Sequence, residues 1–238
     1  MAVHPQHVGA APLTPLRVAA AIPAYEAARS IGAVVTGTRA VLRDVLVIDD
    51  GSRDGTAAAA RDAGAEVLVR PVNEGKGAAL RAAFEVLFAR GFDAVVTLDA
   101  DGQHLPEEIP RLLAAAADAD LVLGTRDHLF AGMSRTRRLS NGLSSRVISV
   151  VAGQAISDVM TGFRLYARAL IARAGFPESR FDAETAIVVR AVRLGFRVVT
   201  TPVRLGYADG RATSHYRSVL DSVRIARAVV RARLGSSR

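Results

Sequence analysis

Short apolar runs alternate with longer helix-like stretches along most of this chain. The runs are rich in β-branched residues, which predicts buried strands. They lie at residues 18–22, 45–48, 66–69, 92–98, 120–123 and 198–203. Helices are predicted at residues 30–42, 57–63, 78–89, from 106 onward, 139–151 and 181–194. Strands that alternate with helices are typical of βαβ units, so we expect an α/β fold: a Rossmann-like, doubly wound, mostly parallel sheet with helices on both faces.

The two ends of the chain depart from this pattern. Residues 1–16 carry three prolines and no hydrophobic periodicity, which predicts a flexible tail. Residues 17–210 are expected to form one domain. Residues 211–238 contain a polar loop and then a basic helix at 217–234 whose apolar stripe lies among arginines. Such a stripe packs either on the parent domain or on an anionic membrane surface, and both alternatives stay open.

Composition narrows the class of protein. Of the 238 residues, 50% are hydrophobic, which is typical of a globular chain. The chain has no cysteine, which excludes disulfides, thiolate metal sites and cysteine nucleophiles. It shows no signal-peptide pattern and no apolar run long enough to cross a bilayer, so we expect a cytoplasmic protein.

An excess of positive charge points to an anionic partner. Lys and Arg number 31 against 23 Asp and Glu, a net charge of +8. A phosphorylated substrate, an acidic membrane surface or nucleic acid would fit that charge. Nucleic acid is not expected, because aromatic residues are few, tryptophan is absent and no zinc-finger or RNP-type motif occurs. A GC-rich genome would produce the same arginine usage without any such partner.

Polar loops follow three of the predicted strands, at residues 23–26, 49–56 and 99–104. The carboxyl ends of parallel strands meet at one edge of a doubly wound sheet, and ligands bind outside that edge. We therefore expect these three loops to form a single site.

The loop Asp99-Ala100-Asp101-Gly102-Gln103-His104 carries the most specific chemistry. Two carboxylates and an amide leave the strand at alternate positions, and their hard oxygen atoms suit Mg²⁺ or Mn²⁺. The spacing is wrong for an EF-hand. The alternative is a polar strand-to-helix loop with a capping aspartate.

Two familiar nucleotide-binding motifs are missing. No Gly-x-Gly-x-x-Gly follows a strand, and Asn73-Glu74-Gly75-Lys76-Gly77 lacks the upstream Gly and the Ser/Thr of a P-loop. The sequence thus argues against a dinucleotide site and an ATP-hydrolysing site. Gly75-Lys76-Gly77 has two interpretations. It either brings a cation and backbone N–H groups close to a phosphate at a helix N-terminus, or it is a turn with a surface lysine.

The second half supplies further charged candidates. Three arginines lie within residues 134–138, and residues 158–166 suggest a loop that leads into a short strand. Asp182 and Glu184 lie in or near the first turn of a predicted helix. Because the helix dipole favours acids there, both helix capping and an acceptor site stay open for these two residues.

Together these motifs resemble a known family. Ile22-Pro23-Ala24-Tyr25-Glu26, the 47–56 stretch, Asn73-Glu74-Gly75-Lys76-Gly77 and the 99–104 loop are similar to family 2 glycosyltransferases of the GT-A fold. Downstream, Thr161-Gly162-Phe163-Arg164 and Phe181-Asp182-Ala183-Glu184 look like the dolichyl- or polyprenyl-phosphate sugar synthase branch. The resemblance covers residues 17–207.

The resemblance implies a role for each motif. The divalent ion, Mg²⁺ or Mn²⁺, would be held by Asp99, Asp101 and Gln103. Catalytic candidates are Asp101, Arg126, Asp182 and Glu184. The nucleotide-sugar would contact Pro23, Tyr25, Glu26, Asp49, Asp50, Lys76 and Asp99. The acceptor would contact Arg135, Arg137, Arg138 and Arg164.

The implied reaction moves a hexose from a donor such as GDP-mannose or UDP-glucose to polyprenyl or dolichyl phosphate, with inversion, at the inner face of the cell membrane. A lipid phosphate is already ionised and needs positioning cations, whereas a sugar hydroxyl needs a general base such as Asp182 or Glu184. Two alternatives stay open: a soluble sugar or phosphorylated small-molecule acceptor, and a nucleotide- or nucleic-acid-binding protein without turnover.

Overall fold

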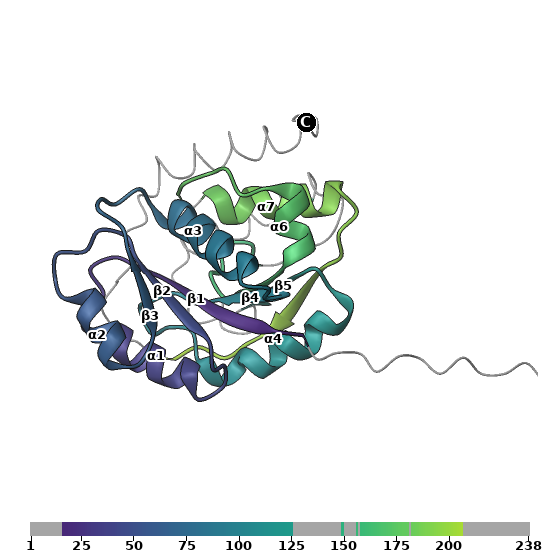
Figure 1. Cartoon of the computed structure of the whole chain (residues 1–238). Coiled ribbons are helices and arrows are strands. Elements are labelled where there is room, and N and C mark those ends of the chain that lie inside the picture. Colours follow the sequence, from purple (N-terminus) through teal and green to yellow (C-terminus); the bar gives the residue numbers. More distant parts are fainter. Residues whose placement is uncertain (1–15, 126–148, 150–155, 157, 181, 207–238) are drawn as a thin grey trace, which may run out of the picture.

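The computed structural model describes residues 16–125, 149, 156, 158–180 and 182–206. Its centre is a seven-stranded sheet with the order β3-β2-β1-β4-β6-β5-β7 (Figure 1). The strands are β1 (Val18–Ala24), β2 (Val45–Asp49), β3 (Glu66–Val69), β4 (Ala94–Thr97), β5 (Leu121–Thr125), β6 (Arg164–Ala167) and β7 (Val198–Pro202). The predicted α/β fold with a mostly parallel sheet is confirmed.

One strand runs against the others. Strands β3, β2, β1 and β4 pair in parallel, as do β5 and β7, but β6 is antiparallel to both β4 and β5. A strand pattern carries no information about direction, so the sequence predicted a strand here without its orientation. Because of this reversal, the loop that enters β6 lies at the same edge as the loops that leave β4 and β5.

Helices cover both faces of the sheet, as predicted. They are α1 (Ile31–Arg39), α2 (Thr56–Asp62), α3 (Lys76–Ala89), α4 (Ile109–Ala115), α6 (Arg168–Ala174) and α7 (Asp182–Arg193). Helices α3, α6 and α7 lie on one face, and α1, α2 and α4 on the other (Figure 1). Strand β1 is buried on both faces: Ala19 and Ala21 pack toward α3, and Ala20 and Ile22 toward α1. This double burial explains its uninterrupted apolar run.

Two helix boundaries bear on the site. Helix α3 begins at Lys76, two residues earlier than predicted, after Gly75 at a φ of 102°. The helix predicted from Pro106 begins as a 3₁₀ turn, Pro106–Glu108, and continues as α4. The predicted tail at 1–16, apart from Leu16, the 139–151 helix, apart from Ser149, and the 211–238 segment lie outside the described residues.

In the part of the chain that the structure describes, no helix is both long enough and apolar enough to span a membrane.

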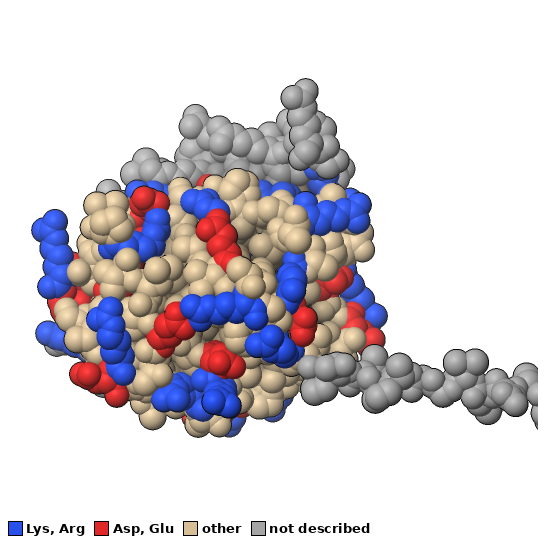
Figure 2. Space-filling model, viewed as in Figure 1, with Lys and Arg blue, Asp and Glu red and all other residues tan. Residues whose placement is uncertain are grey.

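Basic and acidic side chains are mixed over the face of the molecule in Figure 2. The described residues of this face therefore form no single basic patch.

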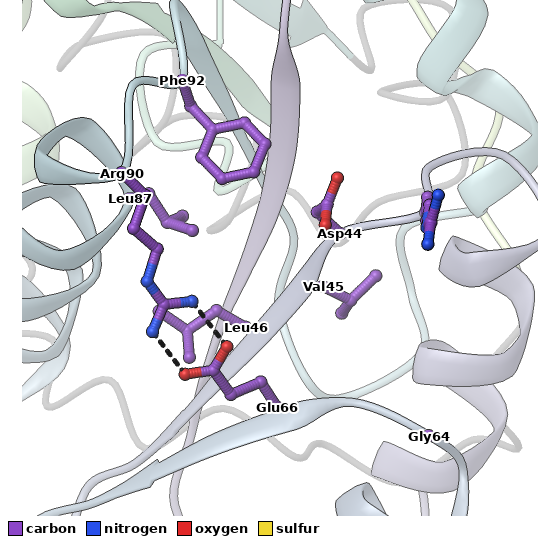
Figure 3. A pocket seen from close by; sticks show the side chains of 9 residues that line it. Asp44, Val45, Leu46, Gly64, Glu66, Leu87, Arg90 and Phe92 are labelled. Atoms are coloured by element: carbon purple, nitrogen blue, oxygen red, sulfur yellow. Dashed lines mark hydrogen bonds and ion pairs between the residues drawn. The ribbon is translucent and has the colours of Figure 1, made fainter.

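A small pocket lies at the amino-terminal edge of the sheet, where β2 and β3 begin and α3 ends (Figure 3). Glu66 and Arg90 face each other there through two hydrogen bonds of 2.6 Å. These bonds join the first residue of β3 to the end of α3, at the edge opposite the polar loops.

Candidate active site

The three predicted loops follow neighbouring parallel strands. Strand β1 lies between β2 and β4, so residues 23–26, 49–56 and 99–104 all leave the carboxyl edge of the sheet. The prediction that they share an edge is confirmed.

The loop after β2 holds the loop after β1 in place. Ser52 Oγ accepts a hydrogen bond from the Glu26 amide (2.8 Å), and Thr56 Oγ1 accepts one from the Ala27 amide (2.8 Å). Asp49 Oδ1 accepts the Ser52 N–H (2.9 Å), which closes a turn within the loop. Residues 49–56 therefore fix the position of the loop after β1 at this edge.

Asp50 organises the loop that leads into α3. Its side chain is buried, and Oδ1 accepts hydrogen bonds from Arg70 Nη1 (2.7 Å) and the Glu74 amide (3.2 Å). Its Oδ2 accepts the Gly75 N–H (2.7 Å). Both oxygens thus have partners inside the protein, and contact with a nucleotide base stays a prediction for Asp50 and Asp49.

Lys76 is enclosed between two carboxylates. Its Nζ lies 2.6 Å from Asp99 Oδ1 and 2.9 Å from Glu184 Oε2, and its side chain is 13% exposed. Burial alone would lower the pKa of the Lys76 ammonium, but the two carboxylates more than offset it and raise the pKa. The surface-lysine alternative is therefore wrong. Lys76 is a charged group inside the site, and its predicted contact with the nucleotide-sugar stays a prediction.

Gly162 covers this ion cluster. A Cβ at this position would clash with Asp99 Oδ2 and would lie 2.6 Å from Lys76 Nζ. The Gly162 carbonyl accepts a hydrogen bond from Thr97 Oγ1 (2.9 Å). This bond holds the Gly162 backbone close to Asp99 and Lys76. In the sequence, Gly162 is only one position of the motif Thr161-Gly162-Phe163-Arg164. Nothing in that motif indicates that a side chain at the entry to β6 would clash with two charged groups.

The Asp99-to-His104 loop is held from both sides. Asp101 Oδ1 accepts the Gln103 N–H (3.0 Å), and Gln103 O accepts the N–H of Gly206, beyond β7 (3.0 Å). Buried His104 accepts the Asp99 N–H at Nδ1 (3.1 Å) and stacks on Phe163.

The oxygen atoms of this loop suit a divalent ion but do not form a complete cage. Within the described parts of the chain, no three His, Cys, Asp or Glu side chains are grouped to hold a metal. Asp101 and Gln103 supply hard oxygens, while Asp99 Oδ1 is bound to Lys76. Mg²⁺ typically takes few protein ligands and completes its shell with substrate phosphate and water, so these residues fit such an ion.

Arg164 is a structural residue in this arrangement. Its side chain is fully buried and donates to the carbonyl oxygens of Thr161 (2.7 Å), Val159 (2.7 Å) and Glu184. Its guanidinium does not reach the surface, so we withdraw its predicted contact with an acceptor. The other predicted cations, Arg126, Arg135, Arg137 and Arg138, lie outside the described residues.

The two acids of α7 have different surroundings. Asp182 is half-buried and accepts the N–H of Arg180, which lies two residues before it and outside α7 (3.3 Å). Glu184 is 4% exposed and reaches Lys76 with Oε2, while its Oε1 lies 4.0 Å from Arg164 Nε. Glu184 therefore belongs to the ion cluster, while helix capping and an acceptor contact both stay predictions for Asp182.

Pro23, Tyr25 and Glu26 lie at the end of β1 and in the following turn. Tyr25 is 36% exposed, and Glu26 has a left-handed φ of 50°. Their predicted contact with the nucleotide stays a prediction.

The comparison with known proteins identifies the family. The sequence model of "Glycosyl transferase family 2" matches residues 20–175, more than half of the chain. The chain belongs to glycosyl transferase family 2. The resemblance found in the sequence is confirmed, and this family 2 protein is a glycosyltransferase.

Its relatives include enzymes named for polyprenyl phosphates. Undecaprenyl-phosphate mannosyltransferase of Micrococcus luteus is 34% identical over 202 residues, which are 79% of this chain and 83% of that protein. Polyprenol monophosphomannose synthase of Mycolicibacterium smegmatis is 35% identical over 173 residues, 67% of this chain and 65% of that protein. The family 2 chain thus spans just under two thirds of the second relative.

A solved structure supports the fold. Glucosyl-3-phosphoglycerate synthase from Mycobacterium tuberculosis, crystallised with Mn²⁺, uridine diphosphate and phosphoglyceric acid, has a TM-score of 0.71. The identity is 20%, and the match covers 92% of this chain and 79% of that one. At this identity the likeness concerns the fold alone.

Proposed function

We propose that this glycosyltransferase moves a hexose from a nucleotide-sugar to polyprenyl phosphate, with inversion and with the help of Mg²⁺ or Mn²⁺. The observation that carries the proposal is the convergence of the three loops on one edge, in a chain whose relatives are named for polyprenyl-phosphate sugar transfer. We place the reaction at the inner face of the cell membrane, with residues 17–210 as the transferase domain.

The donor is proposed to lie along the loops after β1, β2 and β4. Asp101 and Gln103 would hold the divalent ion on the diphosphate. When bound, the ion neutralises charge on the departing nucleoside diphosphate as a Lewis acid. Asp99 would lie beside the nucleotide, and its Oδ1 is kept in place by Lys76. The base and ribose would contact the Tyr25 turn, Pro23, Glu26, Asp49 and Asp50.

The surroundings of the acids favour a phosphate acceptor. A sugar hydroxyl needs a general base near the reacting oxygen. Glu184 is buried and bound to Lys76, so it does not present its carboxylate to an incoming hydroxyl. Asp182 is then the remaining candidate on α7. An ionised lipid phosphate needs only orientation by cations, for which Arg126, Arg135, Arg137 and Arg138 are the proposed residues.

The test is transfer of labelled sugar from a panel of nucleotide-sugars to polyprenyl phosphate, with extraction into an organic phase. We expect organic-phase label with Mn²⁺ or Mg²⁺ and none with EDTA. Asp101→Asn should abolish transfer. Glu107→Gln is the matched control, since Glu107 is an exposed acid in the 3₁₀ turn after the loop.

The other outcomes separate the alternatives. Label confined to a water-soluble product would contradict the lipid acceptor and favour a soluble one. Metal-dependent nucleotide binding without transfer to any acceptor would favour a binding protein without turnover. Full activity of Asp101→Asn would contradict the metal role.

A further inference from the structure

A buried ion cluster joins three elements that are far apart in the sequence. Lys76 opens α3, Asp99 follows β4, and Glu184 lies in the first turns of α7. The Lys76 ammonium bridges the two carboxylates at 2.6 and 2.9 Å. We infer that Lys76 is a positioning residue for sugar transfer, which fixes Asp99 on the donor side relative to Glu184 and α7.

Burial in the cluster increases inward from the loop. The Asp99 side chain is 30% exposed, Lys76 13% and Glu184 5%. Asp99 is therefore the member that a nucleotide can reach, and Lys76 lies behind it. The sequence predicted that Lys76 contacts the nucleotide-sugar directly. The order of burial instead favours a role in which Lys76 acts on the substrate through Asp99.

The backbone around Lys76 packs closely against residues 178–180. A Cβ at Gly75 would lie 2.6 Å from the Ser179 carbonyl, and one at Gly77 would lie 2.6 Å from the Glu178 carbonyl. The Ala78 amide also donates to the Ser179 carbonyl (3.0 Å). The start of α3 is thus seated against the segment that leads into α7.

The charges in the cluster are balanced. Lys76 contacts both Asp99 and Glu184, and Arg164 Nε lies 4.0 Å from Glu184 Oε1, so the largely buried cluster holds two cations and two anions. Removing the Lys76 charge would leave two carboxylates with a single cation. Such a loss perturbs both stability and geometry, so a single substitution cannot distinguish charge balance from positioning.

A double substitution makes that distinction. The inference rests on the proposed function, so turnover is measured with the acceptor on which the wild-type protein is active. Lys76→Met should lower kcat on the order of 100-fold, because a small misplacement of a positioned group costs that much. In Lys76→Met/Glu184→Gln, the charges of Arg164 and Asp99 remain, so the cluster as a whole is neutral again. We expect the melting temperature to recover and kcat to stay low.

Two further measurements complete the design. The Kd for nucleoside diphosphate with Mn²⁺ should stay within about threefold of wild type in Lys76→Met, because the lost interaction acts on turnover rather than on donor affinity. Arg90→Met is the control, since it removes the ion pair with Glu66 at the opposite edge. This control should leave kcat unchanged.

Each contrary result has a distinct meaning. Recovery of kcat in the double variant would show that Lys76 only balances the charge of the carboxylates, and this would overturn the inference. A loss of nucleotide affinity as large as the loss in kcat would make Lys76 a direct donor ligand and also overturn it. A wild-type protein that uses only a water-soluble acceptor would overturn the proposed lipid acceptor while leaving this comparison intact.

Discussion

At the scale of single residues, the site depends on Gly162, which carries no side chain. Gly162 lets the chain pass over Asp99 and Lys76 at a distance that no Cβ allows. Gly162→Ala should therefore displace one of the two charged groups, lower the free energy of unfolding by about 1–3 kcal/mol and abolish transfer. Chemical denaturation and the transfer assay measure the two effects.

Gly32→Ala is the matched control for that substitution. Gly32 lies within α1, and a Cβ there would meet only the Ala59 carbonyl at 3.8 Å, an ordinary contact. Alanine is the better helix former, so this variant should be stabilised by about 0.5–1 kcal/mol and keep its activity. A stable, active Gly162→Ala protein would show that the ion cluster is not fixed by the backbone above it.

The sequence predicted which residues gather at the edge better than it predicted their partners. The 99–104 loop and the acids of α7 were identified as site residues. The enclosed position of Lys76 and the buried contacts of Arg164 were not. These contacts join distant segments, and no local spacing encodes which carboxylate or carbonyl a cation will meet.

At the scale of elements, strand β3 was predicted with its observed bounds, and α3 began two residues before its predicted start. Periodicity identifies an element from the burial of its own residues. It contains no information about pairing, which is why the antiparallel direction of β6 emerged only from the structure.

The ion pair between β3 and α3 gives a pH-dependent prediction. The hydrogen bond from Arg90 lowers the pKa of Glu66 below its usual value of 4.5 in the folded protein. The pair therefore stabilises the fold above about pH 4.5, and that contribution disappears as the pH falls through the lowered pKa. Both side chains are about half exposed, so the contribution is at most about 1 kcal/mol.

Urea denaturation of wild type and Glu66→Gln over a pH series measures this contribution. The difference in unfolding free energy should be present near neutrality, vanish in acid and shrink with added salt. A difference that persists unchanged in acid would assign the effect of the substitution to packing in the pocket of Figure 3.

At the scale of the whole molecule, donor binding should stabilise the fold only when the metal is present. A nucleoside diphosphate at about 100 times its Kd adds about 2.7 kcal/mol to the free energy of unfolding. For a chain of this size, that corresponds to a rise in melting temperature of roughly 5–10 °C. Thermal denaturation with UDP or GDP, in Mn²⁺ and in EDTA, measures it.

Asp101→Asn should lose this metal-dependent rise while retaining the melting temperature of the free protein. Its side chain lies in a loop and is not part of the core. An equal rise in EDTA and in Mn²⁺ would show that the nucleotide binds without the ion, and Asp101 and Gln103 would cease to be candidate ligands.

The reversed direction of β6 has an evolutionary consequence. The chain leaves β5 at Thr125 and enters β6 at Arg164 on the same edge, and the Gly124 amide donates to the Phe163 carbonyl (2.8 Å) where the two strands meet. The segment between them therefore begins and ends at the carboxyl edge of the sheet, next to the loops of the candidate site. We expect this segment to vary in length and composition among relatives, while the register of the sheet stays constant. Because the proposed acceptor residues Arg135, Arg137 and Arg138 belong to this segment, we expect its exchange between relatives to change the acceptor and to leave the proposed donor loops as they are.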